Sequence, residues 1–218
     1  MNFAFFGGTF DPPHRGHIGI AKAAADAFPL DTIMFAPVGN QPLKPGITLT
    51  PYADRLAMVT LACEECGPSP LNSIGKRHTH FSASAIDHPR PDGAPNYTVD
   101  TLDLFLRKTP GAKLYCLVGA DSFLSLRKWH EPDRLLSLAE WIVVSRPGYS
   151  LADLSALALT EEQRSRVHLL ETAHYDVSST WLRERLAAGD SARDLLPESV
   201  ARYIRDHHLY RNPSDIGE

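Results

Sequence analysis

The sequence predicts an α/β fold in which helices cover both faces of a parallel β-sheet. Short, nearly continuous apolar runs of strand length alternate with longer segments whose apolar residues recur at helical spacing. Such runs are typical of strands buried on both faces, and their alternation with helices is typical of parallel sheets. The length of 218 residues is enough for one domain with a substantial core.

The predicted strands are the apolar runs Asn2–Phe6, Thr32–Ala36, Phe81–Ile86, Lys113–Val118, Trp141–Ser145 and Val167–Leu170. Helical spacing, as of Leu56 and Val59, predicts the intervening elements. These predicted helices span Gly16–Phe28, Tyr52–Cys66, Thr98–Lys108, Ser122–Arg127, Ser179–Ala188 and Ser199–His207. The pattern therefore contains at least five strands, each reached through a helix or a long connection.

A single domain is expected to span residues 1–210, followed by a flexible polar tail at 211–218. The stretch from Gly67 to Asn96 is rich in Pro, Ser, His and Gly, which predicts loops around one short strand. Such long connections often carry substrate-binding residues, although they can also be plain surface loops.

Composition limits the partners and the location. The formal net charge of −4 includes no basic excess, so neither nucleic acid nor a membrane surface is an expected partner. No apolar run reaches the roughly 18 residues of a membrane span, and the first residues are typical of a strand rather than a signal peptide. Cys63, Cys66 and Cys116 are interpreted as structural or incidental thiols, and their odd number fits a reducing cytoplasm.

Polar residues gather where four predicted strands end. The segments that follow these strands are GGTFDPPHRGH, PVGNQPLKPG, GADSF and DVSSTWLRERL. Ligands of open parallel sheets bind beyond the carboxyl ends of the strands, near the point where the strand order reverses. The four segments together therefore predict a ligand site at that edge of the sheet.

The first of these segments, residues 7–17, is typical of a phosphate site at the start of a helix. Gly7 and Gly8 allow a close approach to the backbone, and Thr9 offers a hydroxyl and an N–H group. His14 and His17 are three residues apart and share one face of the first turn, where free N–H groups and the helix dipole attract anions.

Other interpretations of residues 7–17 compete with the phosphate site. The segment lacks the GxxxxGK[ST] of a Walker loop and the GxGxxG of a dinucleotide site. A zinc site would need further ligands at suitable spacing, and HxxH alone is insufficient. The remaining alternative is a helix cap with two solvent-facing histidines that take no part in chemistry.

Two motifs at opposite ends of the chain carry a family resemblance. GGTFDPPHRGH resembles the signature of the nucleotidyltransferase superfamily with an HxGH motif, and VSSTWLR at 177–183 resembles its second signature. NYTVDTL at 96–102, GAD at 119–121 followed by Trp129, VSRPG at 144–148 and YIRDHHLY at 203–210 are similar to segments of bacterial nicotinate-nucleotide adenylyltransferases. The resemblance covers Asn2 to Tyr210 and implies a Rossmann-like fold of the nucleotidyltransferase type.

The resemblance implies an adenylyl transfer from ATP to nicotinate mononucleotide, which gives deamido-NAD and pyrophosphate in NAD biosynthesis. The residues implied to be catalytic are His14, His17, Lys44, Thr180 and Arg183. Those implied to bind ATP and its phosphates are Gly7, Gly8, Thr9, Phe10, Gly119, Asp121, Ser178 and Ser179. Those implied to bind the mononucleotide are Tyr97, Thr98 and Trp129, with Trp129 stacked on the pyridine ring.

The expected partners are thus the small molecules ATP and nicotinate mononucleotide, and an oligomer is left open. Mg²⁺ is implied on the ATP phosphates, because the sequence shows no carboxylate cluster for an all-protein cage. Leu43 stands where the family often has His, next to the retained basic Lys44. The alternatives are an adenylyltransferase that uses nicotinamide mononucleotide or phosphopantetheine, and an inactive nucleotide-binding protein.

Some of these residues also have structural interpretations. Asp121 could cap a helix that begins at Ser122, and Thr98 is a suitable N-cap for its own helix. Trp141 and Trp181 are interpreted as packing residues.

Overall fold

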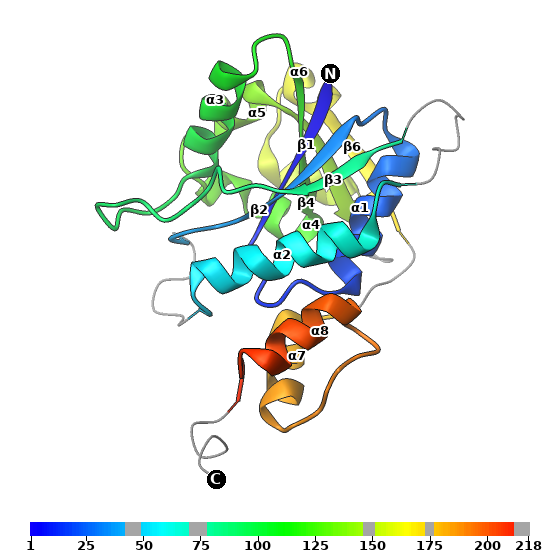
Figure 1. The fold of residues 1–218 in the computed structure, drawn as a ribbon. Coiled ribbons are helices and arrows are strands. Elements are labelled where there is room, and N and C mark those ends of the chain that lie inside the picture. Colours follow the sequence, from blue (N-terminus) through cyan, green and yellow to red (C-terminus); the bar gives the residue numbers. More distant parts are fainter. Residues whose placement is uncertain (42–48, 70–77, 146–150, 173–176, 212–218) are drawn as a thin grey trace.

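The computed structural model describes residues 1–41, 49–69, 78–145, 151–172 and 177–211. In this part of the chain, six parallel strands form one sheet in the order β3-β2-β1-β4-β5-β6 (Figure 1). The strands are β1 (Asn2–Gly8), β2 (Thr32–Pro37), β3 (His80–Ala83), β4 (Lys113–Gly119), β5 (Glu140–Ser145) and β6 (Val167–Glu171). The predicted α/β fold with a parallel sheet is therefore confirmed.

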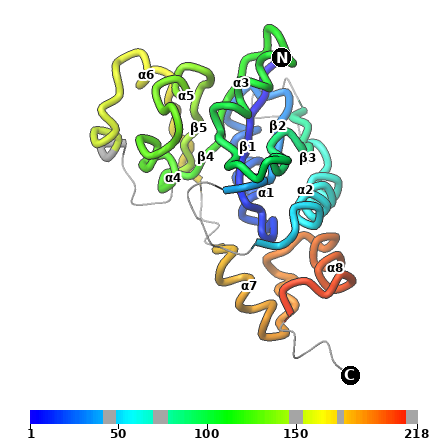
Figure 2. Tube along the Cα trace, turned by 90° about the vertical axis from the view of Figure 1, so that its left-hand side faces the viewer, coloured from blue at the N-terminus to red at the C-terminus, as the bar shows by residue number. Residues whose placement is uncertain are grey.

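The sheet separates two cores, one on each face, and alternate residues of its central strands enter one or the other. In β1, Ala4 and Phe6 belong to the first core and Phe5 to the second. The first core is covered by α1 (Arg15–Ala27), α2 (Tyr52–Cys66), α7 (Ser179–Ala187) and α8 (Glu198–Asp206). The second is covered by α3 (Thr98–Lys108), α4 (Ala120–Leu124), α5 (Pro132–Leu138) and the 3₁₀-helix η2 (Leu151–Leu157). Figure 2 shows α1 and α2 on one side of the strands and α4 and α5 on the other.

Several short elements differ from the prediction. The expected helix Ser122–Arg127 is divided into α4 and a 3₁₀-helix, η1 (Leu126–Lys128). The pattern does not predict α5, η2 or α6 (Glu161–Ser165), because their five to seven residues show too few turns for a helical period. The predicted strand Phe81–Ile86 is shorter, since the chain turns after β3 where the Ile86 N–H donates to the Ser84 hydroxyl.

The three cysteines are free thiols. Cys63 and Cys116 are buried, and burial raises the pKa of both, that of Cys63 to about 12. They therefore stay protonated and behave as small apolar groups. Among the described residues, no group of three or more His, Cys, Asp or Glu could hold a metal ion, and no helix could cross a membrane.

The helices α7 and α8 lie at the end of the molecule toward which β1 runs (Figures 1 and 2). The Glu65 carboxylate at the end of α2 accepts hydrogen bonds from the N–H groups of Glu198 (3.0 Å) and Ser199 (2.7 Å). These N–H groups begin α8 and have no partner within the helix, and the helix dipole favours a negative charge beside them. The Tyr203 hydroxyl also donates to Asp54 Oδ1 at 2.8 Å. Polar contacts with α2 thus fix the start and the middle of α8.

The capping role of Glu65 can be tested with a matched neighbour. Glu65→Ala should lower the free energy of unfolding by about 1 kcal/mol, because it removes the group that caps α8. Glu64→Ala changes an adjacent exposed residue and should alter this free energy by less than about 0.5 kcal/mol. Urea denaturation of the two variants measures both values, and equal effects would exclude the cap.

Candidate active site

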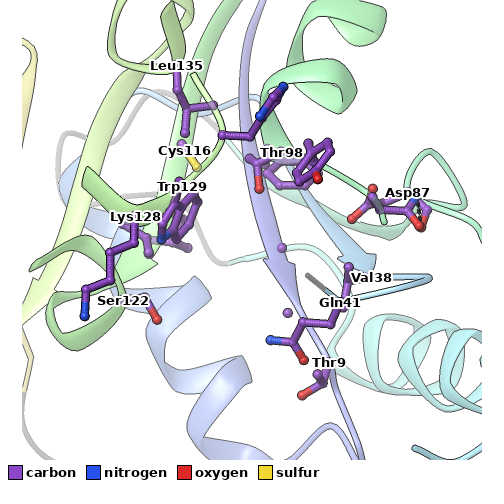
Figure 3. Close-up of a pocket in the computed structure, with 18 residues that line it drawn as sticks. Thr9, Val38, Gln41, Asp87, Thr98, Cys116, Ser122, Lys128, Trp129 and Leu135 are labelled. Carbon is purple, nitrogen blue, oxygen red and sulfur yellow. Dashed lines mark hydrogen bonds between the residues drawn. The ribbon is translucent and has the colours of Figure 1, made fainter. Parts of the chain in front are cut away.

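A pocket of about 340 Å³ lies at the carboxyl ends of β1 and β4 (Figure 3). The strand order reverses between these strands, since β2 and β3 continue outward from β1, and β5 and β6 from β4. Such a reversal leaves a crevice between connections that leave the sheet toward opposite faces. Phe5 of β1 and its pairing partner Cys116 of β4 both line the pocket.

The pocket brings together residues from separate motifs of the sequence. Its lining includes six of the implied site residues: Gly7, Gly8, Thr9, Tyr97, Thr98 and Trp129. Three of the implied phosphate contacts and all three implied mononucleotide contacts therefore line one cavity. The described lining does not include His14, His17 or the start of α7.

Residues 7–17, which we call the phosphate loop after the role that the family resemblance implies, need their glycines for space. A Cβ atom at Gly7 would lie 2.7 Å from the ring of Phe5, and one at Gly8 would lie 3.2 Å from the ring of Phe10. Any larger residue would therefore displace an aromatic ring that supports the loop. With glycine at both positions, bare backbone faces the pocket.

A buried carboxylate, that of Asp11, organises the phosphate loop. Asp11 is 1% exposed, and its Oδ1 and Oδ2 atoms accept hydrogen bonds from the Tyr210 hydroxyl (2.6 Å) and the Thr50 N–H (3.1 Å). The buried guanidinium of Arg55 donates to the carbonyls of Thr9 (2.8 Å) and Thr50 (2.9 Å). Buried polar groups require such partners, so segments far apart in sequence determine the shape of the loop.

The two histidines of the loop face each other rather than solvent. His14 is the N-cap of α1 and 5% exposed, and its ring stacks on that of the half-buried His17 with centroids 3.7 Å apart. The His17 ring also lies edge-on to Phe10, at 4.9 Å. This arrangement contradicts the alternative of a cap with two solvent-facing histidines.

Burial also determines the charge of this pair. It lowers the pKa of His14 to about 4 and that of His17 well below its usual value, so both rings are neutral at pH 7. The His14 backbone N–H donates to Nδ1 of His17 at 3.2 Å, which leaves the proton of a neutral His17 on Nε2. The buried Nδ1 of His14 has no hydrogen-bond partner among the described residues. Each ring thus retains unused hydrogen-bonding capacity.

The second motif meets the phosphate loop at the start of α7. The Arg183 guanidinium donates to the Asp11 carbonyl at 2.8 Å and to the Thr180 hydroxyl at 3.3 Å. Ser178 is the N-cap of α7, but its side chain makes no capping hydrogen bond, so the hydroxyl is not used by the helix itself. Two motifs separated by more than 150 residues therefore touch directly.

The implied mononucleotide contacts lie where α3 begins and η1 ends. Tyr97 is the N-cap of α3 and Thr98 its first residue, which corrects the interpretation of Thr98 as the cap. The half-buried Trp129 donates its indole N–H to the Ser125 hydroxyl at 3.3 Å. The ring of Tyr97 stacks on that of His130 with centroids 4.2 Å apart. Aromatic side chains thus come from both of these elements to the pocket (Figure 3).

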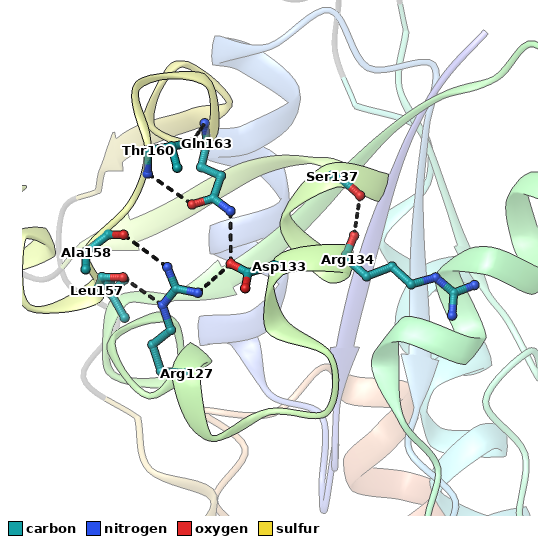
Figure 4. A network of polar contacts seen from close by, with 8 residues as sticks. All are labelled: Arg127, Asp133, Arg134, Ser137, Leu157, Ala158, Thr160 and Gln163. Carbon is teal, nitrogen blue, oxygen red and sulfur yellow. Dashed lines mark hydrogen bonds and ion pairs between the residues drawn. The ribbon is translucent and has the colours of Figure 1, made fainter.

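A polar network supports the segment that carries Trp129 (Figure 4). The Arg127 guanidinium donates to Asp133 Oδ1 at 2.6 Å and to the Leu157 carbonyl at 2.7 Å. The Gln163 amide donates to the same Asp133 oxygen at 3.0 Å. The network joins η1 to α5, η2 and α6, three elements that the sequence pattern does not predict.

Other implied residues lie outside these contacts. Gly119 is the N-cap of α4, which begins at Ala120, so Asp121 does not cap a helix at Ser122. Asp121 is exposed in the first turn, and neither it nor Gly119 is among the described lining of the pocket. Lys44 and Leu43 lie outside the described residues.

One of the two residues interpreted as packing is not buried. Trp141 is fully buried, whereas Trp181 is 46% exposed beside the guanidinium of Arg185, 4.9 Å from its ring centroid. Helical spacing does not place Trp181 with the buried Leu182 and Leu186, so its exposure follows from its position on α7.

Sequence reasoning missed four residues of the site: Arg55, Asp87, His130 and Tyr210. The Asp87 carboxylate lines the pocket and accepts the Thr101 hydroxyl at 2.8 Å, and burial raises its pKa to about 6. Asp87 and His130 lie in connections without a motif, and Arg55 lies within a helical pattern. The segment around Tyr210 resembles the family, but the sequence does not predict its contact with Asp11. Only the fold reveals these neighbours.

Comparisons with known proteins agree with this geometry. A family model described as cytidylyltransferase-like matches residues 5–185. Two relatives carry the name "Probable nicotinate-nucleotide adenylyltransferase". The one from Roseiflexus sp. (strain RS-1) is 41% identical over 94% of this chain and 96% of its own. The one from Thermomicrobium roseum is 37% identical over 94% and 90%.

A solved structure shows the same fold. The Plasmodium falciparum nicotinic acid mononucleotide adenylyltransferase complexed with NaAD has a TM-score of 0.69 at 17% identity, covering 96% of this chain and 97% of that one. The family match spans most of the chain, and the relatives align over nearly all of it. This chain therefore belongs to the cytidylyltransferase-like family and, within it, to the nicotinate-nucleotide adenylyltransferases.

Proposed function

We propose that this chain transfers the adenylyl group of ATP to nicotinate mononucleotide, giving deamido-NAD and pyrophosphate for NAD biosynthesis. The observation that carries this proposal is the shared pocket, in which the phosphate loop lies beside Tyr97, Thr98 and Trp129. Such a site suits a dinucleotide, because phosphate contacts lie beside aromatic side chains that can pack against a ring. The names of the relatives support the same acceptor.

The proposed reaction is an in-line displacement at the α-phosphorus of ATP. A 5′-phosphate oxygen of the mononucleotide forms a bond to this phosphorus, the bond to the oxygen that bridges to the β-phosphorus breaks, and pyrophosphate leaves. The nucleophile is already an anion, so no strong general base is required. Catalysis then consists of aligning the phosphates and stabilising their crowded charge.

The described residues fit these tasks. Neutral His17 can donate its Nε2 proton to a phosphate oxygen. His14 would add a second donor if its ring carries the proton on Nδ1, which is buried and has no hydrogen-bond partner within the described part of the chain. Arg183 is held by the Asp11 carbonyl and keeps further N–H groups for the leaving pyrophosphate. The hydroxyls of Ser178, Ser179 and Thr180 would add donors at the start of α7. Lys44 is proposed as a further cation for the phosphates.

Mg²⁺ is part of the proposal as an ion bound by ATP. In the ranges that the structure describes, no group of three or more His, Cys, Asp or Glu could hold a metal ion. The proposed ion would therefore take its ligands mainly from phosphate oxygens and water. When bound, Mg²⁺ would neutralise phosphate charge. The protein groups would then orient the phosphates rather than coordinate the ion.

The start of α3 favours a substrate that carries nicotinate rather than nicotinamide. Tyr97 and Thr98 line the pocket at the N-terminus of this helix, where backbone N–H groups lack helical partners. Such groups and the helix dipole attract a carboxylate. We propose that they contact the nicotinate carboxylate while Trp129 stacks on its ring.

The function is tested by assaying the purified protein with Mg-ATP and either mononucleotide. Nicotinate mononucleotide should give the dinucleotide and pyrophosphate with the higher kcat/KM. His17→Ala should lower kcat at least ~10²-fold, as loss of a transition-state donor does. His207→Ala alters the exposed histidine that directly follows α8 and should leave kcat nearly unchanged. No product from the wild-type protein would overturn the function, and near-normal turnover of the His17 variant would overturn its role.

The aromatic platform can be tested through KM. Trp129→Ala should raise the KM for the mononucleotide about fivefold and change kcat little, because stacking contributes about 1 kcal/mol to substrate and transition state alike. Trp181→Ala removes an exposed tryptophan from α7 and should not change this KM. Steady-state kinetics of both variants provide the comparison, and an unchanged KM for the Trp129 variant would exclude the platform.

The neutral state of the buried histidines can be tested by pH. His14 has a pKa of about 4 in the folded protein and 6.5 as a free side chain, so only the unfolded chain takes up its proton between these values. The free energy of unfolding should therefore fall as the pH decreases from 6.5 to 4. His14→Gln should reduce this fall by up to about 3 kcal/mol, measured by denaturation across this range. Parallel pH profiles of the two proteins would contradict the assignment.

A further inference from the structure

The last described segment of the chain reaches into the phosphate loop. After α8 ends at Asp206, the half-buried Tyr210 donates its hydroxyl to Asp11 Oδ1 at 2.6 Å. Burial beside the Asp11 carboxylate raises the pKa of this phenol, so Tyr210 remains a proton donor at neutral pH. The hydroxyl therefore supplies one of the hydrogen bonds that a buried carboxylate needs.

Asp11 transmits this contact to a group proposed to act on the phosphates. Its carboxylate is held by Tyr210 and by the Thr50 N–H, while its carbonyl accepts the Arg183 guanidinium at 2.8 Å. A shift of the Asp11 backbone would therefore move the acceptor that positions Arg183. Because the carboxylate is 1% exposed, water cannot readily replace the Tyr210 hydroxyl.

The neighbouring residue connects the same loop to His17. Phe10 has a positive φ of 48°, a conformation that costs a non-glycine residue energy and persists only where the surroundings impose it. Its ring contacts that of His17 edge-on, with centroids 4.9 Å apart. Relaxation of Phe10 and Asp11 would thus displace both His17 and Arg183.

We propose that Tyr210 is a positioning residue for adenylyl transfer, which holds the phosphate loop in its reactive shape through Asp11. This inference rests on the proposed function and adds to it a residue beyond α8 that acts through Asp11. Misplacement of catalytic groups by about 1 Å can lower a rate about 10²-fold. The hydroxyl should therefore affect kcat much more than substrate binding.

The chain offers a matched pair of tyrosines for the test. Tyr210→Phe removes the hydroxyl bound to Asp11, whereas Tyr203→Phe removes one that donates to Asp54 at 2.8 Å between α8 and α2. Tyr210→Phe should lower kcat at least ~10-fold with less than a threefold change in the KM of either substrate. Tyr203→Phe should keep kcat within about twofold of the wild-type value, because this hydroxyl donates to Asp54 rather than to the phosphate loop and such substitutions have small effects.

A double-mutant cycle distinguishes positioning from a loss of stability. Asp11→Asn leaves one oxygen for the two donors, Tyr210 and Thr50, so the Tyr210 effect should largely disappear in that background. Rates are measured well below the melting temperature of every variant. Additive effects in the cycle, or an unchanged kcat in Tyr210→Phe, would overturn the inference. The wild-type protein in the same assay tests the proposed function separately. If the proposed function is wrong, the wild-type protein forms no product, whereas a wrong inference about Tyr210 leaves wild-type turnover intact.

Discussion

The buried carboxylate of Asp11 is the constraint on which the arrangement of the site depends. Its burial requires hydrogen bonds, and these come from Thr50 and Tyr210, while its carbonyl holds Arg183. The partners belong to a connection before α2, to the segment that follows α8 and to α7. One residue therefore joins the sheet, whose first strand ends in the phosphate loop, to the helices α7 and α8.

The net charge of −4 includes no basic excess, so the proposed binding of ATP depends on a few localised donor groups. Burial keeps His14 and His17 neutral, so the free protein does not confine two like charges in stacked rings. Arg183 adds a permanent charge, and the Asp11 carbonyl holds it in position. A phosphate oxygen would thus meet oriented N–H groups that need little reorganisation.

Much of the fold follows from local patterns, and the site follows from them only in part. Buried strands and long helices show their period over enough residues, whereas α5 and α6 are too short. The sequence alone reveals GGTFDPPHRGH, VSSTWLR and Trp129, because each is recognised by its residue types and their spacing. The contacts of Arg55 and Tyr210 are long-range consequences of packing, and sequence spacing carries no record of them. For the same reason the burial of His14 against His17, and hence their neutrality, emerges only in three dimensions.

The most direct measurement is a crystal structure of this protein with deamido-NAD, the proposed product. The pyridine ring should stack on Trp129 with its carboxylate at the start of α3. The pyrophosphate should lie on the backbone of Gly7–Thr9, within hydrogen-bond distance of His17 or Arg183. A dinucleotide bound outside the pocket at the ends of β1 and β4, or with its pyrophosphate away from the phosphate loop, would contradict the account.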